Sequence, residues 1–471
     1  MKLKKIAGFF FPSSSTWGFW LCMGLFFKGV LFFIQIHDHS VDNGYPIPGF
    51  IGGSWGDTQS YLVPIDNLLS GKGYTPDFRL PGYGIVYLPF ALLFSKGGAC
   101  NVLIFIQFIV SSISVYALAL SVKNIFKSNV FFYITFYLYA ISSFSNCYDS
   151  ILLTESLTTS FLVFSIYFFS RYLIKGNRRY VLLSGFFLAW VIFLRPVFVP
   201  LLAVLFVLMF INTKKITIAV LILIPFLLFD GVWVIRNYSL YKKIIPFTKS
   251  LHYFGENSYY PYVFTFCAAW GGCHTDGQTY LLPELSNDNF KPNIPDYIYT
   301  SKFNFDSIHA VRELIKKVTS DSSGVPQKQQ DVYTEKIKQK LTQYAQSIKN
   351  EKPFLYYIKG PSIALEMELS ITYFSVVFLN NYTIMWCKIC YYFTMISGFI
   401  GAVLMLIVFK KNLNSLMFVI IPLYTMVIHG IILRVGENRY IVPSYPFIVV
   451  CAAYAIYSIY LSFFSEKQTN E

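Results

Sequence analysis

Residues 56–83 read GDTQSYLVPIDNLLSGKGYTPDFRLPGY, a stretch rich in Gly, Pro and Tyr that carries an acid, Asp57, and an arginine, Arg79. It follows the first long apolar segment, Trp17–Ile36, and most of the chain beyond it is apolar. A spanning helix needs about 20 apolar residues. The sequence therefore predicts a first membrane helix at 17–36, followed by a polar loop that we expect to carry the chemistry.

Composition indicates a polytopic, all-α membrane protein. The chain has 471 residues, of which 55% are hydrophobic and only 13% charged, whereas a soluble domain carries roughly 25% charged residues. The net charge of +14 lies largely in short loops, so it points to membrane orientation and not to nucleic acid. The basic start resembles a signal peptide, but no small-x-small cleavage pattern follows, so we expect a retained helix with the N-terminus inside.

The apolar runs predict about ten spans. Besides 17–36, they are expected at 102–120, 130–144, 153–169, 181–194, 198–211, 216–234, 390–409, 416–433 and 441–463. The loops after the second, fourth and sixth of these spans are basic and would face the cytoplasm, in agreement with the positive-inside rule. Both termini would then be cytoplasmic. The short apolar run 85–93 contains a proline and is expected to lie in the interface without spanning.

Two long regions, 37–100 and 237–382, are left on the outer side. The first belongs to an N-terminal transmembrane catalytic module, 1–236, and the last helices form a C-terminal module, 383–471. The region 237–382 is turn-rich at first and then shows two helical patterns of apolar residues. These are Val311, Leu314, Ile315 and Val318, and then Ile337, Leu341, Tyr344 and Ile348. We expect a small, mostly helical outer subdomain.

The aromatic stretch 354–378 follows these two patterns in the outer region. It contains a Gly360-Pro361 pair, and proline is poorly tolerated inside a helix. We therefore expect an interfacial segment that is interrupted at this pair.

Four arginines lie on the predicted outer side, where positive charge is depleted: Arg79, Arg195, Arg236 and Arg439. An ionisable group at membrane depth costs several kcal/mol unless it is paired or functional. The arginine fork binds two phosphate oxygens at once, so the set favours an anionic ligand at the outer leaflet. The alternative is snorkelling with pairing to local acids, for which Glu155, Asp230 and Glu437 are available.

The acids and the first-helix lysine also allow ordinary structural interpretations. Asp57 after a glycine is often a turn or helix-cap residue. Thr154 and Glu155 are compatible with a simple N-cap, because a carboxylate is favoured near a helix N-terminus. Lys28 lies in the middle of the first predicted span, and Asp230 is a possible partner.

Metal and disulfide sites have weak signals. His37 and His39 with Asp38 and Asp42 are compatible with a divalent cation, but a solvated turn is favoured. No metal ligand is therefore assigned. Cys267 and Cys273 bracket AAWGG in the predicted outer region, where a disulfide and two free thiols are equally expected.

Six short motifs occur in order along the chain. They are GDxxxY (56–61), RLPGY (79–83), TES (154–156), LRP (194–196), IRNY (235–238) and ENRYIVP (437–443). Together they resemble the GT-C superfamily of glycosyltransferases. The branch that they resemble most is that of the protein O-mannosyltransferases and the lipid A aminoarabinose transferases. The resemblance covers most of the chain except the outer subdomain.

The resemblance implies a GT-C-like helix bundle with an active site at the outer interface and a polyprenyl-phosphate-linked sugar as donor. It assigns the catalytic base to Asp57 and makes Glu155 the candidate second acid. The four arginines occupy motif positions that would surround the donor phosphate. Other substrate-binding positions are Tyr61, Tyr83, Asn237 and Tyr440. Many members have an acidic pair in the first loop, but Thr58 follows Asp57 here, which leaves a divalent metal possible but not required.

The expected function is a membrane glycosyltransferase, in a bacterial inner membrane, that acts on a glycan, lipid or protein acceptor. Two alternatives stay open. An envelope polymerase or ligase would use a polyprenyl-diphosphate-linked glycan and similar arginines. A flippase or transporter would show repeated halves and polar residues at mid-membrane, and the sequence shows no such repeat.

Overall fold

The computed structural model describes residues 11–41, 47–75, 79–247, 258–272, 275–285, 289–319, 326–371, 380–408 and 412–468. Within these ranges the regular structure is helical and no strand occurs, which confirms the predicted all-α class. The chain forms two compact units. The first unit comprises Met1–Thr248, Thr372–Pro422 and Val442–Glu471, and the second comprises Lys249–Ile371 and Leu423–Ile441. The second unit thus contains most of the predicted outer region and, in addition, 423–441.

Seven helical segments are long and apolar enough to span a membrane: Trp17–His39, Lys96–Phe126, Glu155–Lys175, Pro196–Thr213, Asn381–Val408, Leu413–Leu433 and Asn438–Phe463. Each matches a predicted span, and together they indicate an integral membrane protein. The total of ten spans stays a prediction.

The other three predicted spans correspond to shorter or broken helices: α6 (Asn129–Ala140), α9 (Arg178–Leu194), and α11 (Ile216–Val220) followed by α12 (Ile224–Tyr241). The 12 residues of α6 reach about 18 Å, less than the hydrocarbon thickness of about 30 Å. Pro225 in the first turn of α12 lacks an N–H, so it suits a helix start better than a helix interior.

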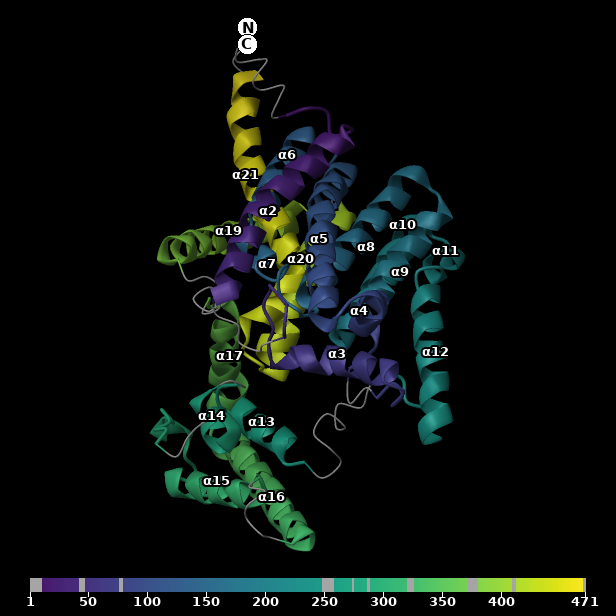
Figure 1. The fold of residues 1–471 in the computed structure, drawn as a ribbon. Coiled ribbons are helices and arrows are strands. Elements are labelled where there is room, and N and C mark those ends of the chain that lie inside the picture. The colour runs from purple at the N-terminus through teal and green to yellow at the C-terminus, as the bar shows by residue number, and fades with distance from the viewer. Residues whose placement is uncertain are drawn as a thin grey trace. The chain divides into compact units, whose positions relative to one another are not determined.

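The first unit is a helix bundle. Its helices α2 (Trp17–Val41), α5 (Lys96–Phe126) and α8 (Glu155–Lys175) lie side by side (Figure 1). This unit also contains α7 (Ser143–Asn146), η1 (Pro196–Phe198), α10 (Val199–Thr213), α19 (Asn381–Val408), η8 (Leu413–Ser415) and α21 (Tyr445–Gln468). Helix α20 (Leu416–Met426) begins in it.

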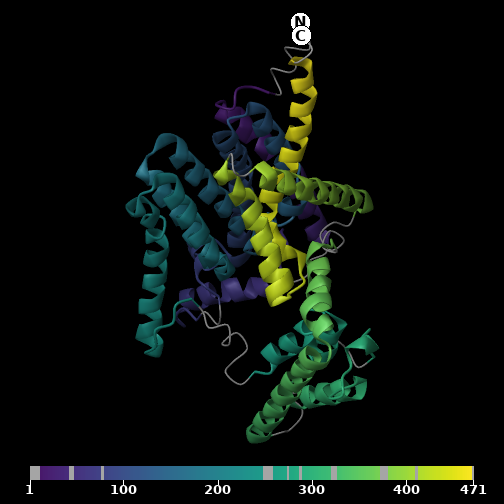
Figure 2. The ribbon, with the colours of Figure 1, turned by 180° about the vertical axis from the view of Figure 1, so that it is seen from behind.

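Helix α19 packs closely on α21 (Figure 2). A Cβ added at Gly401 of α19 would lie 1.7 Å from the carbonyl oxygen of Cys451 in α21. The crossing therefore needs a residue without a side chain, as is common where membrane helices approach each other closely.

Two helices of the first outer loop follow the opening polar stretch: α3 (Gly56–Leu69) and α4 (Gly82–Leu93). They pack on each other, and a Cβ added at Gly84 would meet the side chain of Ile65 at 3.0 Å. The predicted short helix at 85–93 is part of α4, whose 12 residues are too few to span a membrane.

The second unit has its own apolar core, built by α13 (Tyr260–Ala268), α15 (Phe305–Thr319) and α16 (Gln327–Glu351). The two predicted helical patterns are confirmed, because all eight apolar residues lie in this core or pack against it. The other elements are α14 (Asp276–Leu281), η3 (Pro283–Leu285), η4 (Asp296–Ile298), η6 (Leu355–Lys359), α17 (Gly360–Leu369) and η9 (Val427–Leu433); η10 (Asn438–Ser444) begins in this unit.

The predicted break at Gly360-Pro361 is wrong. Helical structure is continuous from residue 353 to 369, and the break lies earlier, at Lys352. The turn before the proline, η6, is a π-helix. In a π-helix the hydrogen bonds are spaced more widely than in an α-helix. The missing N–H of Pro361 therefore does not interrupt the hydrogen-bond pattern. Residues 372–378 of the predicted interfacial stretch lie outside the described ranges.

Candidate functional site

The N-termini of α3 and α8 are docked through a backbone bridge. The N–H of Gly53 donates to the 150–152 segment at 2.9 Å, and its C=O accepts from the same segment at 2.9 Å. Thr58 Oγ1, in the first turn of α3, donates to this segment as well, at 2.9 Å. Asp57 and Glu155 are therefore both first-turn carboxylates of helices anchored on one short segment, where the helix dipole favours negative charge.

The first carboxylate is paired with an arginine in a partly open position. Arg79 Nη2 lies 2.8 Å from Asp57 Oδ1, and the two side chains are 26% and 21% exposed. Arg79 Nε donates to Ser60 Oγ at 3.0 Å, and the guanidinium lies 4.5 Å from the Tyr61 ring centroid. Both charged groups are therefore held in place and yet remain accessible to a ligand.

The second carboxylate is paired in a buried position. Arg195 Nη2 donates to Glu155 Oε1, and the side chains are 11% and 1% exposed. Arg195 Nε donates to Thr154 Oγ1 at 3.1 Å. Thr154 does occupy the N-cap position, but its hydroxyl makes no capping bond to the helix. The N-cap interpretation thus holds for the position of Thr154 and for the first-turn carboxylate of Glu155, but the Thr154 hydroxyl binds the Arg195 guanidinium and does not cap a backbone N–H.

Two tyrosines lie near these pairs. The rings of Tyr61 and Tyr83 lie 5.2 Å apart, and the buried Tyr83 hydroxyl donates to Gln107 Oε1 at 2.8 Å. Burial raises the pKa of Tyr83 well above its usual value, and the nearby Cys100, Tyr61 and Glu155 raise it further. Tyr83 is therefore a neutral phenol at physiological pH, close to both carboxylate–arginine pairs.

The start of α4 also lies against the end of α9, next to Arg195. A Cβ added at Gly82 would be 2.6 Å from the carbonyl oxygen of Phe193. Arg195 itself has an extended backbone, φ −146°, as expected for the residue before a proline. This extended residue ends α9 and places the guanidinium beside the first turn of α8.

Arg236 lies near the part of the first outer loop that precedes Arg79. Its Nη2 donates to the Tyr74 carbonyl at 3.0 Å and its Nη1 to Asn237 Oδ1 at 2.9 Å. The guanidinium lies 4.9 Å from the Trp233 ring centroid. A small apolar cluster of Leu80, Phe193 and Trp233 joins this part of α12 to the neighbours of Arg79 and Arg195. Five of the predicted charged site residues are thus linked within the first unit.

Arg439 and Tyr440 belong to the second unit. Arg439 Nε lies 2.8 Å from Glu437 Oε1, and the Tyr440 ring stacks on His429 at 4.7 Å. This is the pairing with Glu437 that the sequence left open as an alternative. The convergence of Arg439 with the first-unit residues stays a prediction.

A buried acid in the second unit was missed by the sequence analysis. Glu368 of α17 lies against the backbone of Gly430, where an added Cβ would be 2.7 Å from Glu368 Oε2. Burial raises the pKa of Glu368 to about 8. The signal available in the sequence was a pair of acids, Glu366 and Glu368, within an apolar aromatic stretch.

The predicted Lys28–Asp230 pair is wrong. Lys28 Nζ lies 3.5 Å from Asp149 Oδ2, and the two side chains are 0% and 2% exposed. Asp230 instead accepts from the N–H of Phe247 at 3.3 Å. A lysine inside a span predicts a buried acid as its partner, but the choice between two acids depended on helix packing.

Within the described ranges, no three His, Cys, Asp or Glu side chains gather as a metal site. His37 Nδ1 lies 3.3 Å from Asp38 Oδ1. Asp42 and Cys273 lie outside the described residues, so the weak metal motif and the possible disulfide are not described further.

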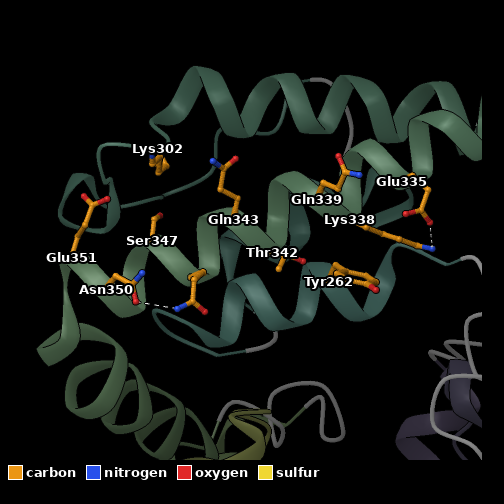
Figure 3. A pocket seen from close by; sticks show the side chains of 11 residues that line it. Tyr262, Lys302, Glu335, Lys338, Gln339, Thr342, Gln343, Ser347, Asn350 and Glu351 are labelled. Carbon is orange, nitrogen blue, oxygen red and sulfur yellow. Dashed lines mark hydrogen bonds and ion pairs between the residues drawn. The ribbon is translucent and has the colours of Figure 1, made fainter.

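A groove of about 630 Å³ runs along α16 in the second unit (Figure 3). Its lining side chains carry mostly amide, hydroxyl and charged groups: Tyr262, Lys302, Glu335, Lys338, Gln339, Thr342, Gln343, Gln346, Ser347, Asn350 and Glu351. Gln346 Nε2 donates to Asn350 Oδ1 at 3.0 Å, and Lys338 pairs with Glu335 at 2.7 Å. The groove offers many hydrogen-bonding groups and one aromatic ring.

No family model and no curated protein matches the chain. The first unit offers two carboxylates that can accept a proton and three arginines that can bind anionic oxygens.

Proposed function

We propose that the protein is a membrane glycosyltransferase that moves a sugar from a polyprenyl-phosphate donor to an acceptor hydroxyl. One observation carries the proposal: the first turns of α3 and α8, anchored on one short segment, each present a carboxylate paired with an arginine. Proton acceptors beside phosphate-binding groups, next to apolar helices, are what transfer from a lipid phosphate requires. The motif resemblance gives separate support.

The reaction is a single displacement with inversion at the anomeric carbon. Asp57 takes the proton from the acceptor hydroxyl, and that oxygen bonds to the anomeric carbon. The bond from this carbon to the phosphate oxygen breaks, and polyprenyl phosphate leaves with the electron pair. A positioned general base typically contributes about 10²–10⁴-fold to the rate. Asp57 is assigned as the base because it is the more exposed of the two carboxylates.

The arginines stabilise the leaving phosphate. Negative charge develops on the phosphate as the sugar bond breaks, so prearranged cations stabilise the transition state more than the ground state. Arg79 pairs with Asp57. A bound phosphate would share Arg79 and so leave Asp57 available to accept the proton. Arg195 and Arg236 would supply further contacts.

The acceptor is proposed to be selected by the second unit. Sugar hydroxyls both donate and accept hydrogen bonds, and side-chain amides do the same. The groove of Figure 3 presents four amides, from Gln339, Gln343, Gln346 and Asn350. These amides would give a glycan acceptor several hydrogen-bonding partners. The proposed setting is a bacterial inner membrane with the active site on the periplasmic face.

The test uses the purified full-length protein in lipid nanodiscs. A panel of sugar-loaded polyprenyl monophosphates is incubated with envelope glycans, and released polyprenyl phosphate is measured by mass spectrometry. Asp57→Asn is expected to abolish release. Asp66→Asn is the matched control, because Asp66 lies in the same helix and pairs with Lys96 at 2.7 Å; it is expected to keep activity.

Three outcomes would count against the proposal. Full activity of Asp57→Asn would remove Asp57 as the base. Turnover of polyprenyl-diphosphate glycans alone would favour the polymerase or ligase alternative. Movement of the intact lipid across the bilayer without bond cleavage would favour a flippase.

A further inference from the structure

The buried Lys28–Asp149 pair has no part in the mechanism above, yet it lies in the interior of the first unit. Lys28 of α2 donates to Ser111 Oγ of α5, and its ammonium lies 5.0 Å from the Tyr139 ring centroid of α6. Asp149 Oδ1 accepts from Ser156 Oγ of α8 at 2.6 Å. One ion pair thus connects four helices around residue 149.

A buried ion pair is weak evidence for stability. Removing two charges from water costs much of what their attraction returns, and apolar residues of similar volume are often as stable or more so. A pair of this kind fixes a specific arrangement more effectively than it strengthens the fold.

The pair holds one end of the 149–155 segment, which joins α7 to α8 with little regular structure. The backbone of this segment is held from the side by Gln107. Gln107 Nε2 donates to the carbonyls of Asp149 at 3.1 Å and Ile151 at 2.9 Å. Just before the segment, Gln35 Nε2 donates to the Cys147 carbonyl at 2.7 Å. Side chains from α2 and α5 thus set the path of a segment that has no helical ladder of its own.

The same segment carries both halves of the candidate site. The segment ends at Glu155. Its residues Ser150 and Leu152 form hydrogen bonds with Gly53, just before α3, and with Thr58 in the first turn of α3. The amide of Gln107 that holds the segment also accepts from the Tyr83 hydroxyl. Hydrogen bonds therefore link Asp149 through Gln107 to Tyr83, and directly to Ser156, the residue that follows Glu155.

We propose that Lys28 and Asp149 are positioning residues that fix the 149–155 segment and, through it, the relative placement of the Asp57 and Glu155 carboxylates. The placement part of this inference rests on the structure alone; its catalytic consequence rests on the proposed glycosyltransferase function.

The first experiment does not need an activity. Hydrogen exchange of the full-length protein is followed by mass spectrometry in Asp149→Asn and Lys28→Met. Peptides that cover 149–155 and the start of α3 are expected to exchange about 10-fold faster or more, because each variant leaves a buried polar partner unsatisfied. Ser184→Ala is the matched control: it removes a buried bond between α8 and α9 and should leave both peptides unchanged. Unchanged exchange in Asp149→Asn would overturn the proposal.

The second experiment separates positioning from stability. In the double variant Lys28→Met/Asp149→Leu, thermal stability is expected to recover, since no buried charge is left alone. The turnover number kcat is expected to stay about 10²-fold low, because small displacements of reacting groups have effects of this size. The donor KM should change little, since the arginines are retained. Lys28→Arg keeps the positive charge and should therefore retain more of the wild-type kcat than Lys28→Met does. Recovery of both stability and kcat in the double variant would show a merely structural role.

The two proposals fail in different ways. If the wild-type protein transfers no sugar from any polyprenyl monophosphate, the glycosyltransferase function fails, and the exchange experiment still decides whether Lys28 and Asp149 fix the segment. If the wild-type protein is active and the exchange pattern is unaffected by Asp149→Asn, the positioning role fails alone.

Discussion

Glu155→Gln is expected to destabilise the protein far more than Asp57→Asn does, because the two carboxylate–arginine pairs differ in burial. Glu155 and Arg195 are 1% and 11% exposed, so Glu155→Gln leaves a nearly buried guanidinium without its counter-charge. A change of this kind costs about 3–5 kcal/mol. Asp57 and Arg79 are 21% and 26% exposed, and such pairs are worth at most about 1 kcal/mol. Asp57→Asn should therefore remain folded while losing transfer activity.

The stability assay uses the cysteines that the protein already has. Cys100, Cys147, Cys387 and Cys451 are buried, whereas Cys22 is exposed. A thiol-reactive dye in detergent therefore reports unfolding above a constant background as the temperature rises. Glu155→Gln is expected to melt well below the wild type, and Asp57→Asn close to it. Transfer is measured on the same samples below the lower melting point.

Equal melting points for Glu155→Gln and the wild type would refute the argument from burial. A large loss of stability in Asp57→Asn would also refute it, because the lost activity could then be a consequence of unfolding.

Three further outcomes follow from other parts of the fold. Burial raises the pKa of Glu368 to about 8 from 4.5. Thermal stability should therefore fall as the pH rises between these values, and Glu368→Gln should flatten this pH profile. An unchanged slope in that variant would exclude Glu368 as the cause. Gly401→Ala should destabilise by about 1–3 kcal/mol through overlap with Cys451, whereas Gly231→Ala, with nothing within 4 Å, should not; equal melting curves would count against the tight crossing. Tyr83→Phe removes a donor to a buried amide and should cost about 1–3 kcal/mol in the same dye assay, and a neutral result would mean that the bond is replaced.

The sequence was most informative where hydrophobic pattern determines structure. The seven long apolar helices each overlap a predicted span, and the two predicted amphipathic patterns fall in α15 and α16. In these segments one periodic signal extends over many residues, so single exceptions do not change the result. The failures occur where a single residue depends on its surroundings. Gly360-Pro361 was expected to break a helix, but a preceding π-turn accommodates the proline.

Pairing between distant residues was the least predictable feature. Lys28 required an acid, but its partner came from a connecting segment and not from the predicted span that contains Asp230. The outer arginines illustrate the same limit: Arg195 and Arg439 are paired with acids that had been named as alternatives, and Arg79 is paired with Asp57 itself. Charge patterns identify residues that need a partner, and the packing of helices decides which partner they obtain.

The bond from Thr58 to the carbonyl of Leu152 joins residues that are 94 positions apart. At the usual rate of protein synthesis, about 5–20 residues per second, the later residue leaves the ribosome roughly 5–20 s after the earlier one. During that interval the start of α3 has no docking surface, and its polar stretch is available to proteases and chaperones. The proposed base would reach its final place only after the helices that follow it have entered the membrane, so a pulse-labelled, truncated chain ending before residue 150 should be cleaved in this stretch and the full-length chain should be protected.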